Sequence, residues 1–407
     1  MPFPVQQHHL TVDPRALREA LDAHARHLAG GAGGRRLTLT YADLTLAALE
    51  GIDLRDADLT GARLAGAQLA GTNLSRAVLF GADLSEADLR GANLKRADLR
   101  GARLRGANLS GAEMAGCDLR EGRIALQDKL DGYHILRHEH RPGELNDALL
   151  AGANLAGAQM IGAHAVASDF TDASLVGAVL AGARLTGAVL DGADCTNADL
   201  GGADLSRASL KRAVLTGVNL RQTRLNDADL TGVLRAPPAS VFVEDRALAD
   251  VLSDHEAYCD SDGQAGQVTR LAGADFRALG ALENRRLSGL IAPSAIFFGM
   301  NLEGVQMQAA ELSGCDFRGA VLRNADLRGA RFSMALMSRA DLRGARLSIL
   351  AISAARFVRT DFSGAVLRGA DLRGAHAARA RFVRAETDGA RWDGCDLSGA
   401  ERDGGAL

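Results

Sequence analysis

The sequence predicts an all-β solenoid, built from a short strand and a turn repeated many times, and two observations predict it. First, a large apolar residue recurs at every fifth position from Leu44 onward. A period of five fits neither an α-helix nor an alternating strand, but it fits a repeated strand and turn. Second, hydrophobic residues make up 47% of the chain while aromatic residues make up only 4%, and there are 47 glycines. The apolar residues are therefore mostly Ala and Leu. Repeated small residues such as Ala and Gly favour backbone layers in close contact over a core of large side chains.

The period-five pattern occupies three runs, residues 44–124, 150–230 and 297–397, and it is broken at about 125–147. The residue two before the large apolar one is usually Ala, and Gly often follows two after it, so the unit reads A-(D/N)-L-x-G. A small residue fits an inner corner of such a coil, and Gly suits a tight turn. The backbone N–H and C=O groups of a buried chain must then pair between neighbouring coils.

This unit, first seen at Ala42-Asp43-Leu44, resembles the A-(D/N)-L-x-x consensus of the bacterial pentapeptide-repeat family over about three quarters of the chain. The resemblance implies a right-handed quadrilateral β-helix with one pentad per side and four pentads per coil. It also implies that the central Leu or Phe and the preceding Ala point inward. Residues 20 apart would then stack at the inter-strand spacing, about 4.8 Å.

Two amphipathic segments predict short α-helical caps. The first is 14–28, with Asp13 as N-cap and Pro at the first helical position. The second is 245–259, and both contain the spacing Leu-x₃-Leu-x₂-His before a Gly-containing turn and the first pentad. We therefore expect a duplicated module, with one helix and β-helix at 1–234 and another at 240–407. The open ends of a solenoid need such caps.

Each predicted cap contains a histidine, His24 or His255, on its apolar face. Neither is accompanied by a carboxylate or thiol motif at ligand spacing. We therefore favour histidines that hydrogen-bond the coil backbone over metal ligands or catalytic groups.

The interruption at about 125–147 is the most polar part of the first module. It contains three histidines in seven positions, which raises a metal hypothesis, although neighbouring arginines disfavour a bound cation. The alternative is a surface loop or hairpin that contacts a partner. The candidate partner-binding residues are Tyr133, His134, Arg137, His138, His140 and Arg141.

The second module contains a basic stretch. Fourteen arginines lie between positions 318 and 384, against four aspartates. Arg339, Arg359 and Arg379 are 20 apart and would form a ladder at one corner of the coils, which makes them further candidate partner-binding residues. Stacked like charges are unfavourable unless solvated or paired. The stretch therefore indicates either an anionic partner or a solvated surface.

The sequence contains no motif that predicts catalysis. Its aspartates occupy outward repeat positions, and four of its five cysteines occupy inward ones. We expect no enzyme, no cofactor and no bound metal. The favoured function is a protein-interaction scaffold. The alternatives are a DNA-mimicking modulator of DNA gyrase, which the net charge of −3 disfavours, and a metal-dependent sensor or enzyme that uses the histidines at 134–140.

The expected partner is another protein. An anionic surface is compatible with the second module, and self-association is also compatible with a repeat rod. Nucleic acid is disfavoured, because few aromatic residues are free to stack on bases. The chain has no signal peptide and no apolar run of transmembrane length, so we expect a cytoplasmic protein.

Overall fold

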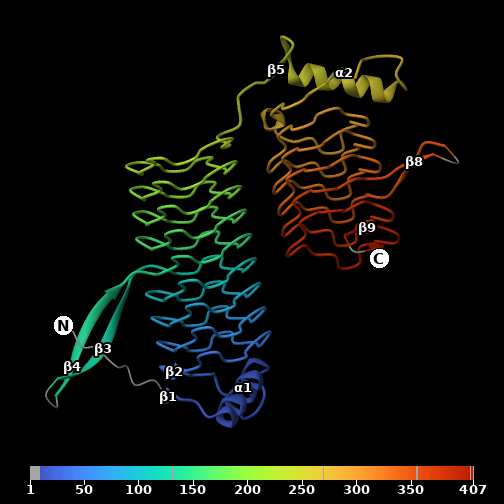
Figure 1. Cartoon of the computed structure of the whole chain (residues 1–407). Coiled ribbons are helices and arrows are strands. Elements are labelled where there is room, and N and C mark those ends of the chain that lie inside the picture. The colour runs from blue at the N-terminus through green and yellow to red at the C-terminus, as the bar shows by residue number, and fades with distance from the viewer. Residues whose placement is uncertain (1–9, 131–132, 269, 354–355, 404, 407) are drawn as a thin grey trace. The chain divides into compact units, whose positions relative to one another are not determined.

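The protein is described from a computed structural model (Figure 1). The chain divides into two compact units, 1–236 and 237–407, which are described separately. The described residues are 10–130, 133–268, 270–353, 356–403 and 405–406.

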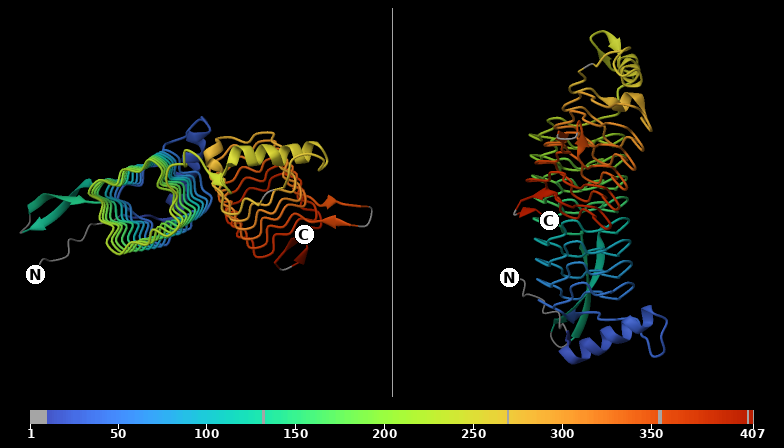
Figure 2. Two further views of the ribbon diagram at one scale, coloured as in Figure 1. Left: turned by 90° about the horizontal axis from the view of Figure 1, so that it is seen from above. Right: turned by 90° about the vertical axis from the view of Figure 1, so that its right-hand side faces the viewer.

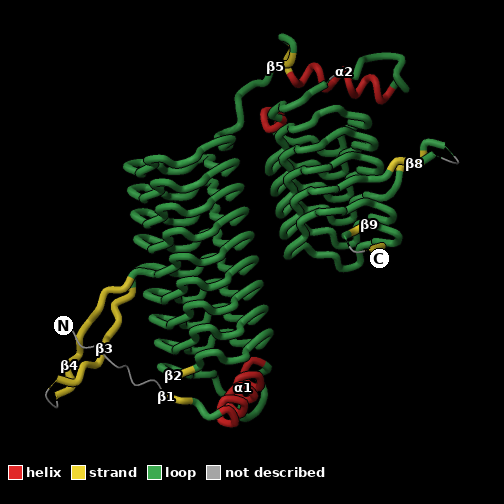
Figure 3. The backbone as a smooth tube through the Cα atoms, in the orientation of Figure 1, coloured by secondary structure: helices red, strands yellow, loops and turns green. Residues whose placement is uncertain are grey.

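Unit 1 is a stack of coils in which residues 20 apart form parallel β-bridges. The bridges begin with Thr38↔Asp58 and continue to Val214↔Leu234. Each pentad contributes a single bridged residue between two turns. For this reason most of the chain is drawn as loops in Figure 3, although the coils are hydrogen-bonded to one another.

The repeat positions follow from the surroundings of each residue in a coil. The central Leu and the preceding Ala are buried, as Leu84 and Ala82 show. The corner requires a positive φ, which Gly91 adopts at 62° and Arg96 adopts at 57°. Glycine reaches this conformation without the steric cost that other residues pay there, and this explains its frequency at the corner.

The N-terminal end of unit 1 is covered by α1 (Pro14–Leu28), which has the bounds expected from the sequence. Asp13 caps it, because its Oδ2 accepts a hydrogen bond from the Ala16 amide at 3.1 Å. The short strand β1 (Leu10–Thr11) pairs in parallel with β2 (Ala42–Asp43).

The coils of unit 1 are interrupted by a long hairpin, β3 (Gly122–Leu130) and β4 (Tyr133–Arg141). Across it the bridge Arg103↔Glu144 joins residues 41 apart instead of 20. The repeat therefore resumes at the buried Leu145, earlier than the predicted position 150. Ile124, which the period assigned to the coil core, lies in β3 and packs on the outside of the coils.

Unit 2 begins with a small hairpin, β5 (Phe242–Val243) and β6 (Arg246–Ala247), followed by α2 (Leu248–Asp260). The helix therefore starts three residues later than the predicted position 245. The 3₁₀ helix η1 (Phe276–Leu279) adds one residue to the first coil, where Arg270 bridges Ile291.

A second, shorter hairpin interrupts unit 2, and the period-five pattern did not predict it. It consists of β7 (Leu350–Ala351) and β8 (Phe357–Val358). Across it Arg331 bridges Asp361, 30 residues away. The C-terminal end has a last pair of strands, β9 (Glu401–Arg402) and β10 (Gly405–Ala406).

The core of unit 2 contains stacked phenylalanines where unit 1 has mostly leucines. Phe297 and Phe317 are parallel with ring centroids 4.6 Å apart, and Phe362 and Phe382 are parallel at 5.0 Å. Offset stacking of this kind adds to the free energy gained by apolar burial.

Candidate functional site

The root of the β3–β4 hairpin is fixed to the coils by backbone contacts that only glycine permits. A Cβ on Gly143 would lie 2.2 Å from the Leu119 carbonyl oxygen, and one on Gly122 would lie 2.9 Å from the Arg100 carbonyl oxygen. Next to these contacts Ile124, only 5% exposed, covers the glycines of two successive coils. The hairpin therefore leaves the coils from a rigid base.

Charged side chains add to this base. The His140 ring Nδ1 contacts the Glu121 carboxylate, and Arg141 Nη2 lies 3.2 Å from Glu139 Oε2. The Arg141 side chain is only 12% exposed. Two of the predicted partner-binding residues, His140 and Arg141, thus lie at the root of the hairpin and pair with acidic residues of the root itself.

The remaining predicted residues of this segment lie in β4, beyond the root. In the register of the hairpin Tyr133 pairs with Leu130, His134 with Lys129, Arg137 with Leu126 and His138 with Ala125. Their side chains are not among those that the structure describes. The hypothesis that the histidines at 134–140 bind a metal therefore stays a prediction. Among the residues that are described, no cluster of three or more His, Cys, Asp or Glu suits a metal ion.

The ribbon moves away from the coils beyond its root, as Figure 1 and the left-hand view of Figure 2 show. Its nine residue pairs run from Gly122↔Arg141 to Leu130↔Tyr133. The segment is therefore a two-stranded ribbon attached at one end.

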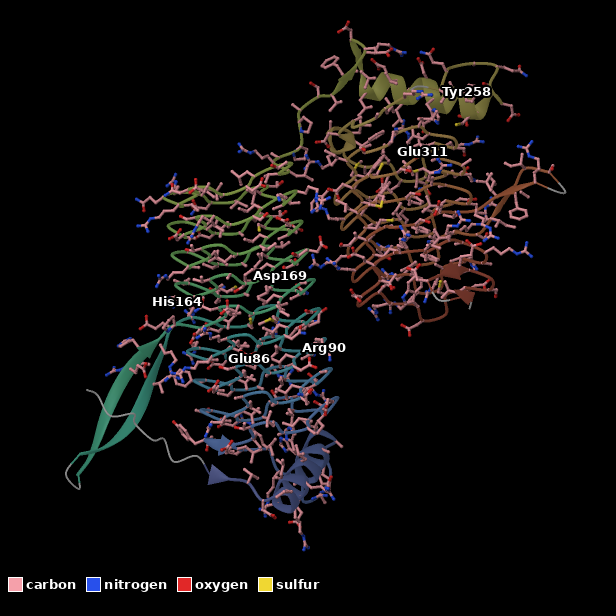
Figure 4. The ribbon with its side chains drawn as sticks, in the orientation of Figure 1. Glu86, Arg90, His164, Asp169, Tyr258 and Glu311 are labelled. Carbon is pink, nitrogen blue, oxygen red and sulfur yellow. The ribbon has the colours of Figure 1, made fainter. Side chains whose placement is uncertain are left out.

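A shallow polar groove of about 330 Å³ lies on the coils that flank the hairpin. His164, labelled in Figure 4, is bridged to Glu144 on one side and Arg184 on the other. Burial lowers the pKa of His164, and the neighbouring Arg184 lowers it further. The groove is lined by Arg105, Asn146, Asp147, His164, Val166 and Arg184.

The groove is lined by more basic than acidic side chains. Arg105 Nε lies 3.6 Å from Asp147 Oδ2, and Asn146 Oδ1 accepts a hydrogen bond from the Val166 amide at 2.8 Å. Arg184 is exposed and forms no ion pair with any described residue. A carboxylate of a partner could therefore bind here.

The predicted ladder of Arg339, Arg359 and Arg379 does not form. Because the β7–β8 hairpin adds ten residues, the bridges Leu336↔Val366 and Asp341↔Asp371 place Arg339 in register with position 369. Arg359 and Arg379 do lie in adjacent coils, since Asp361 bridges Arg381. Arg359 forms an ion pair with Glu401, so the like charges are partly compensated.

Most of the basic stretch in unit 2 is neutralised by nearby carboxylates. In the recurring D-L-R pentad, Arg Nε and Nη2 bind both oxygens of the Asp two residues before, as at Asp371–Arg373 with 2.8 and 2.6 Å. This hydrogen bonding lowers the pKa of Asp371. Between coils Arg331 pairs with Glu311 and Arg381 with Glu401. The stretch is therefore much less positive than its composition indicates.

The outward Asp of the repeat also binds the backbone where no Arg follows it. Asp169 Oδ1 accepts a hydrogen bond from the Thr171 amide at 2.8 Å. An outward Asp or Asn therefore satisfies a backbone donor at the start of a turn.

The cap histidines hydrogen-bond the coil backbone, as expected. His24 Nδ1 accepts from the Leu37 amide at 3.0 Å, and His255 Nε2 lies 3.2 Å from the Ser288 carbonyl oxygen. The other ring nitrogen of each is buried with no hydrogen-bond partner among the described residues. Burial lowers the pKa of both imidazoles.

The inward cysteines have little thiolate character. Burial raises the pKa of Cys117, Cys195 and Cys315 to about 12 and that of Cys395 to about 11. A thiol with so high a pKa is a poor nucleophile at neutral pH.

Sequence reasoning missed the exposed residues of the β7–β8 hairpin. Ile352, Phe357 and Val358 are 54%, 49% and 41% exposed. Ile352 and Phe357 continue the period of five from Leu347, so they resemble core positions. The one local signal is Leu350, a large residue where the pentad needs a small one.

A profile of pentapeptide repeats matches residues 42–121, 144–232, 301–348 and 355–386, together more than half of the chain. No curated protein matches the sequence. No helix in the described part of the chain is long and apolar enough to cross a membrane.

Several solved structures match as well. HetL, a pentapeptide repeat protein of the cyanobacterium Nostoc involved in heterocyst differentiation regulation, is 22% identical with a TM-score of 0.23; the match covers 98% of this chain and all of HetL. Rfr23 of the cyanobacterium Cyanothece is 28% identical over 33% of this chain and 90% of its own, with a TM-score of 0.28. QnrB1, a plasmid-mediated fluoroquinolone resistance protein, is 19% identical over 49% of this chain and 90% of its own, with a TM-score of 0.26.

Proposed function

Because the chain belongs to the pentapeptide-repeat family, we propose that it is a non-enzymatic scaffold that binds another protein through the β3–β4 hairpin. Proteins of this family fold as right-handed quadrilateral β-helices and are generally structural or interaction proteins. We infer the same architecture for both units. The parallel bridges at 20-residue intervals support it.

The projecting ribbon is the observation that carries the proposal. A two-stranded hairpin is at best marginally stable alone in water, because it buries little apolar surface. Here it is nine residue pairs long and joins the coils at its root. A partner that packs against the ribbon, or adds a strand to its edge, would supply the missing burial.

The root of the hairpin suits this role. Gly122, Gly143 and Ile124 hold the ribbon to the coils by close contacts. A rigid base limits the conformational entropy that the ribbon loses when a partner binds. The polar groove around His164 lies on the same coils, where Arg184 can bind a carboxylate of that partner.

Charge compensation on the coil faces disfavours the DNA-mimic alternative. One face of unit 1 mixes acidic and basic side chains along successive bridges, in the order Asp43, Arg63, Asp83, Arg103, Glu144, His164, Arg184, Asp204 and Arg224. A mimic of duplex DNA would need a continuous negative surface. We therefore propose no role on nucleic-acid enzymes.

An experiment on the hairpin must leave the coils of unit 1 intact. Deleting 127–145 would remove the buried Leu145 and the bridged Glu144, so it would damage the coils. A better variant replaces 126–137 with Asn-Gly, which closes the paired residues Ala125 and His138 with a two-residue turn.

The test is an affinity pull-down from native cells, in which bound proteins are identified by mass spectrometry. We expect the full chain to recover a partner and the shortened hairpin to lose it, with unchanged thermal unfolding. Arg90→Gln is the matched control, because Arg90 is exposed on unit 1 and, among the described residues, forms an ion pair only with Asp88 of its own pentad. Equal recovery by the shortened variant would contradict the proposal.

A further inference from the structure

The β7–β8 hairpin of unit 2 presents an apolar surface that the proposed scaffold role does not use. Ile352, Phe357 and Val358 are all exposed, within seven residues of sequence. A contiguous group of exposed apolar side chains on a soluble surface marks an interaction site. We define the hairpin patch as these three residues together with Arg356, Arg359 and Arg379.

The hairpin is held in place by its base. The Thr360 hydroxyl accepts a hydrogen bond from the Gly329 amide at 2.9 Å and donates one to the Ser348 carbonyl oxygen at 2.9 Å. Thr360 is fully buried. The side chains of Leu350 and Val358 lie against Gly329, where a Cβ would come within 2.8 Å of the Leu350 Cβ. The patch is thus presented on a fixed support.

The two faces of the hairpin differ. Leu350 pairs with Val358 on the face toward Gly329, and Ala351 pairs with Phe357, which points to the other face. The Ile352 amide donates to the Arg356 carbonyl oxygen at 2.8 Å and closes the turn. Phe357 therefore extends outward from the coils, and Ile352, at the turn, is 54% exposed.

The charge around these apolar residues is positive. Arg356 and Arg379 are exposed and form no ion pair with any described residue. The nearby acid, Glu401, is already held by Arg359 and Arg381. An occupant of the patch must therefore combine an apolar interior with a negatively charged edge.

The size of the patch separates the two kinds of occupant that meet this condition. A stable protein–protein interface buries about 800 Å² on each partner, far more than three side chains offer. An anionic bilayer needs only a few apolar side chains at the depth of the headgroups and a few basic ones beside them. We propose that the hairpin patch binds anionic lipid membranes, with Ile352 and Phe357 inserted among the headgroups and the arginines at the lipid phosphates. This inference is independent of the role proposed for the β3–β4 hairpin.

The test is co-sedimentation of the full chain with vesicles of phosphatidylcholine containing a minority of phosphatidylglycerol, and with vesicles of phosphatidylcholine alone. We expect binding to the anionic vesicles, weakened by salt, and much less to the neutral ones. Ile352→Ser/Phe357→Ser should lower the partition coefficient at least about tenfold, and Arg356→Gln should lower it by a smaller factor.

Met334→Ser is the matched control, because Met334 is an apolar side chain 68% exposed over Gly364, on a different pentad of unit 2. It should leave the partition coefficient unchanged, and thermal unfolding should be the same for all variants. The proposal is overturned if the full chain does not bind anionic vesicles, or if the serine double variant binds as well as the full chain. Self-association of the full chain that needs Phe357, without vesicle binding, would also overturn it.

Discussion

The two hairpins interrupt the same kind of coil, but they differ in how they enter the repeat. The β3–β4 hairpin adds 21 residues, since Arg103 bridges Glu144 instead of residue 123, and it shifts the period of five by one. The β7–β8 hairpin adds ten, since Arg331 bridges Asp361 instead of residue 351. Ten is a multiple of five, so the pattern continues through it. The comparison teaches that, in this fold, periodicity alone does not establish burial.

The largest expected difference in stability is between substitutions at two residues that occupy equivalent positions of the pattern. Leu145 follows the first hairpin and is fully buried, whereas Ile352 lies in the second and is 54% exposed. Leu145→Asp would bury an unpaired charge and should destabilise unit 1 by about 4 kcal/mol or more. Ile352→Asp should change stability by less than about 0.5 kcal/mol. Chemical denaturation measures both, and equal losses would show that the second hairpin belongs to the coil.

A smaller effect concerns the glycines at the root of the first hairpin. In Gly143→Ala the new Cβ would meet the Leu119 carbonyl oxygen, a backbone atom that cannot move aside. The cost should be about 1–3 kcal/mol. At the corner glycine Gly152, with φ +67° and open space around it, alanine should cost about 1 kcal/mol through its backbone conformation alone. Thermal unfolding of the two variants gives the comparison; a larger loss at Gly152 would refute it.

The caps of the two units should respond to acid. The pKa values of His24 and His255 are lowered in the folded chain, mainly by burial, so the unfolded chain takes up protons first. The contribution of these two histidines to the free energy of unfolding is therefore complete above pH 6.5. It is lost as the pH falls from there toward the lowered pKa values. Protonation of His24 at Nδ1 also breaks its hydrogen bond with the Leu37 amide.

The measurement is the Tm at a series of pH values between 7.5 and 5, compared with His24→Asn. Asparagine keeps an acceptor for the Leu37 amide but does not titrate. We expect the variant to lose part of the acid sensitivity. An identical pH profile would exclude His24 as its source.

A small loss of stability is expected at the outward Asp of the repeat. Asp169→Ala leaves the Thr171 amide without its acceptor at 2.8 Å and should cost about 0.5–1.5 kcal/mol. Asp169→Asn keeps an acceptor oxygen and should cost less. A loss below the detection limit for Asp169→Ala would show that this hydrogen bond contributes nothing to stability.

The predictable part of this protein is the part in which local chemistry repeats. The inward Leu and Ala positions, the corner glycines and the helix at 14–28 follow from side-chain size, turn conformation and capping, all of which are local. The histidine-rich segment could be located because it breaks the period of five. The residue at which it leaves the coils could not be located, because Ile124 continues the period into β3. The prediction of an arginine ladder was wrong, because the extra ten residues move Arg339 out of register with Arg359.

What could not be predicted depends on contacts between residues far apart in the sequence. The pairing of Arg359 with Glu401 joins positions 42 apart, because Arg359 follows the second hairpin directly and Glu401 lies two coils further along. Likewise, the groove around His164 needs Arg105 and Arg184 on coils separated by the first hairpin. Such sites require the register of the coils, which the insertions change.

The central claim is that the β3–β4 ribbon is the surface of unit 1 that a protein partner covers. Hydrogen–deuterium exchange measured by mass spectrometry, on the free protein and on the complex recovered by pull-down, tests it most directly. We predict that peptides spanning 122–141 gain protection in the complex, while peptides from the coils at 57–96 keep the slow exchange expected of paired backbone amides. Unchanged exchange in 122–141 together with new protection elsewhere in unit 1 would contradict the account.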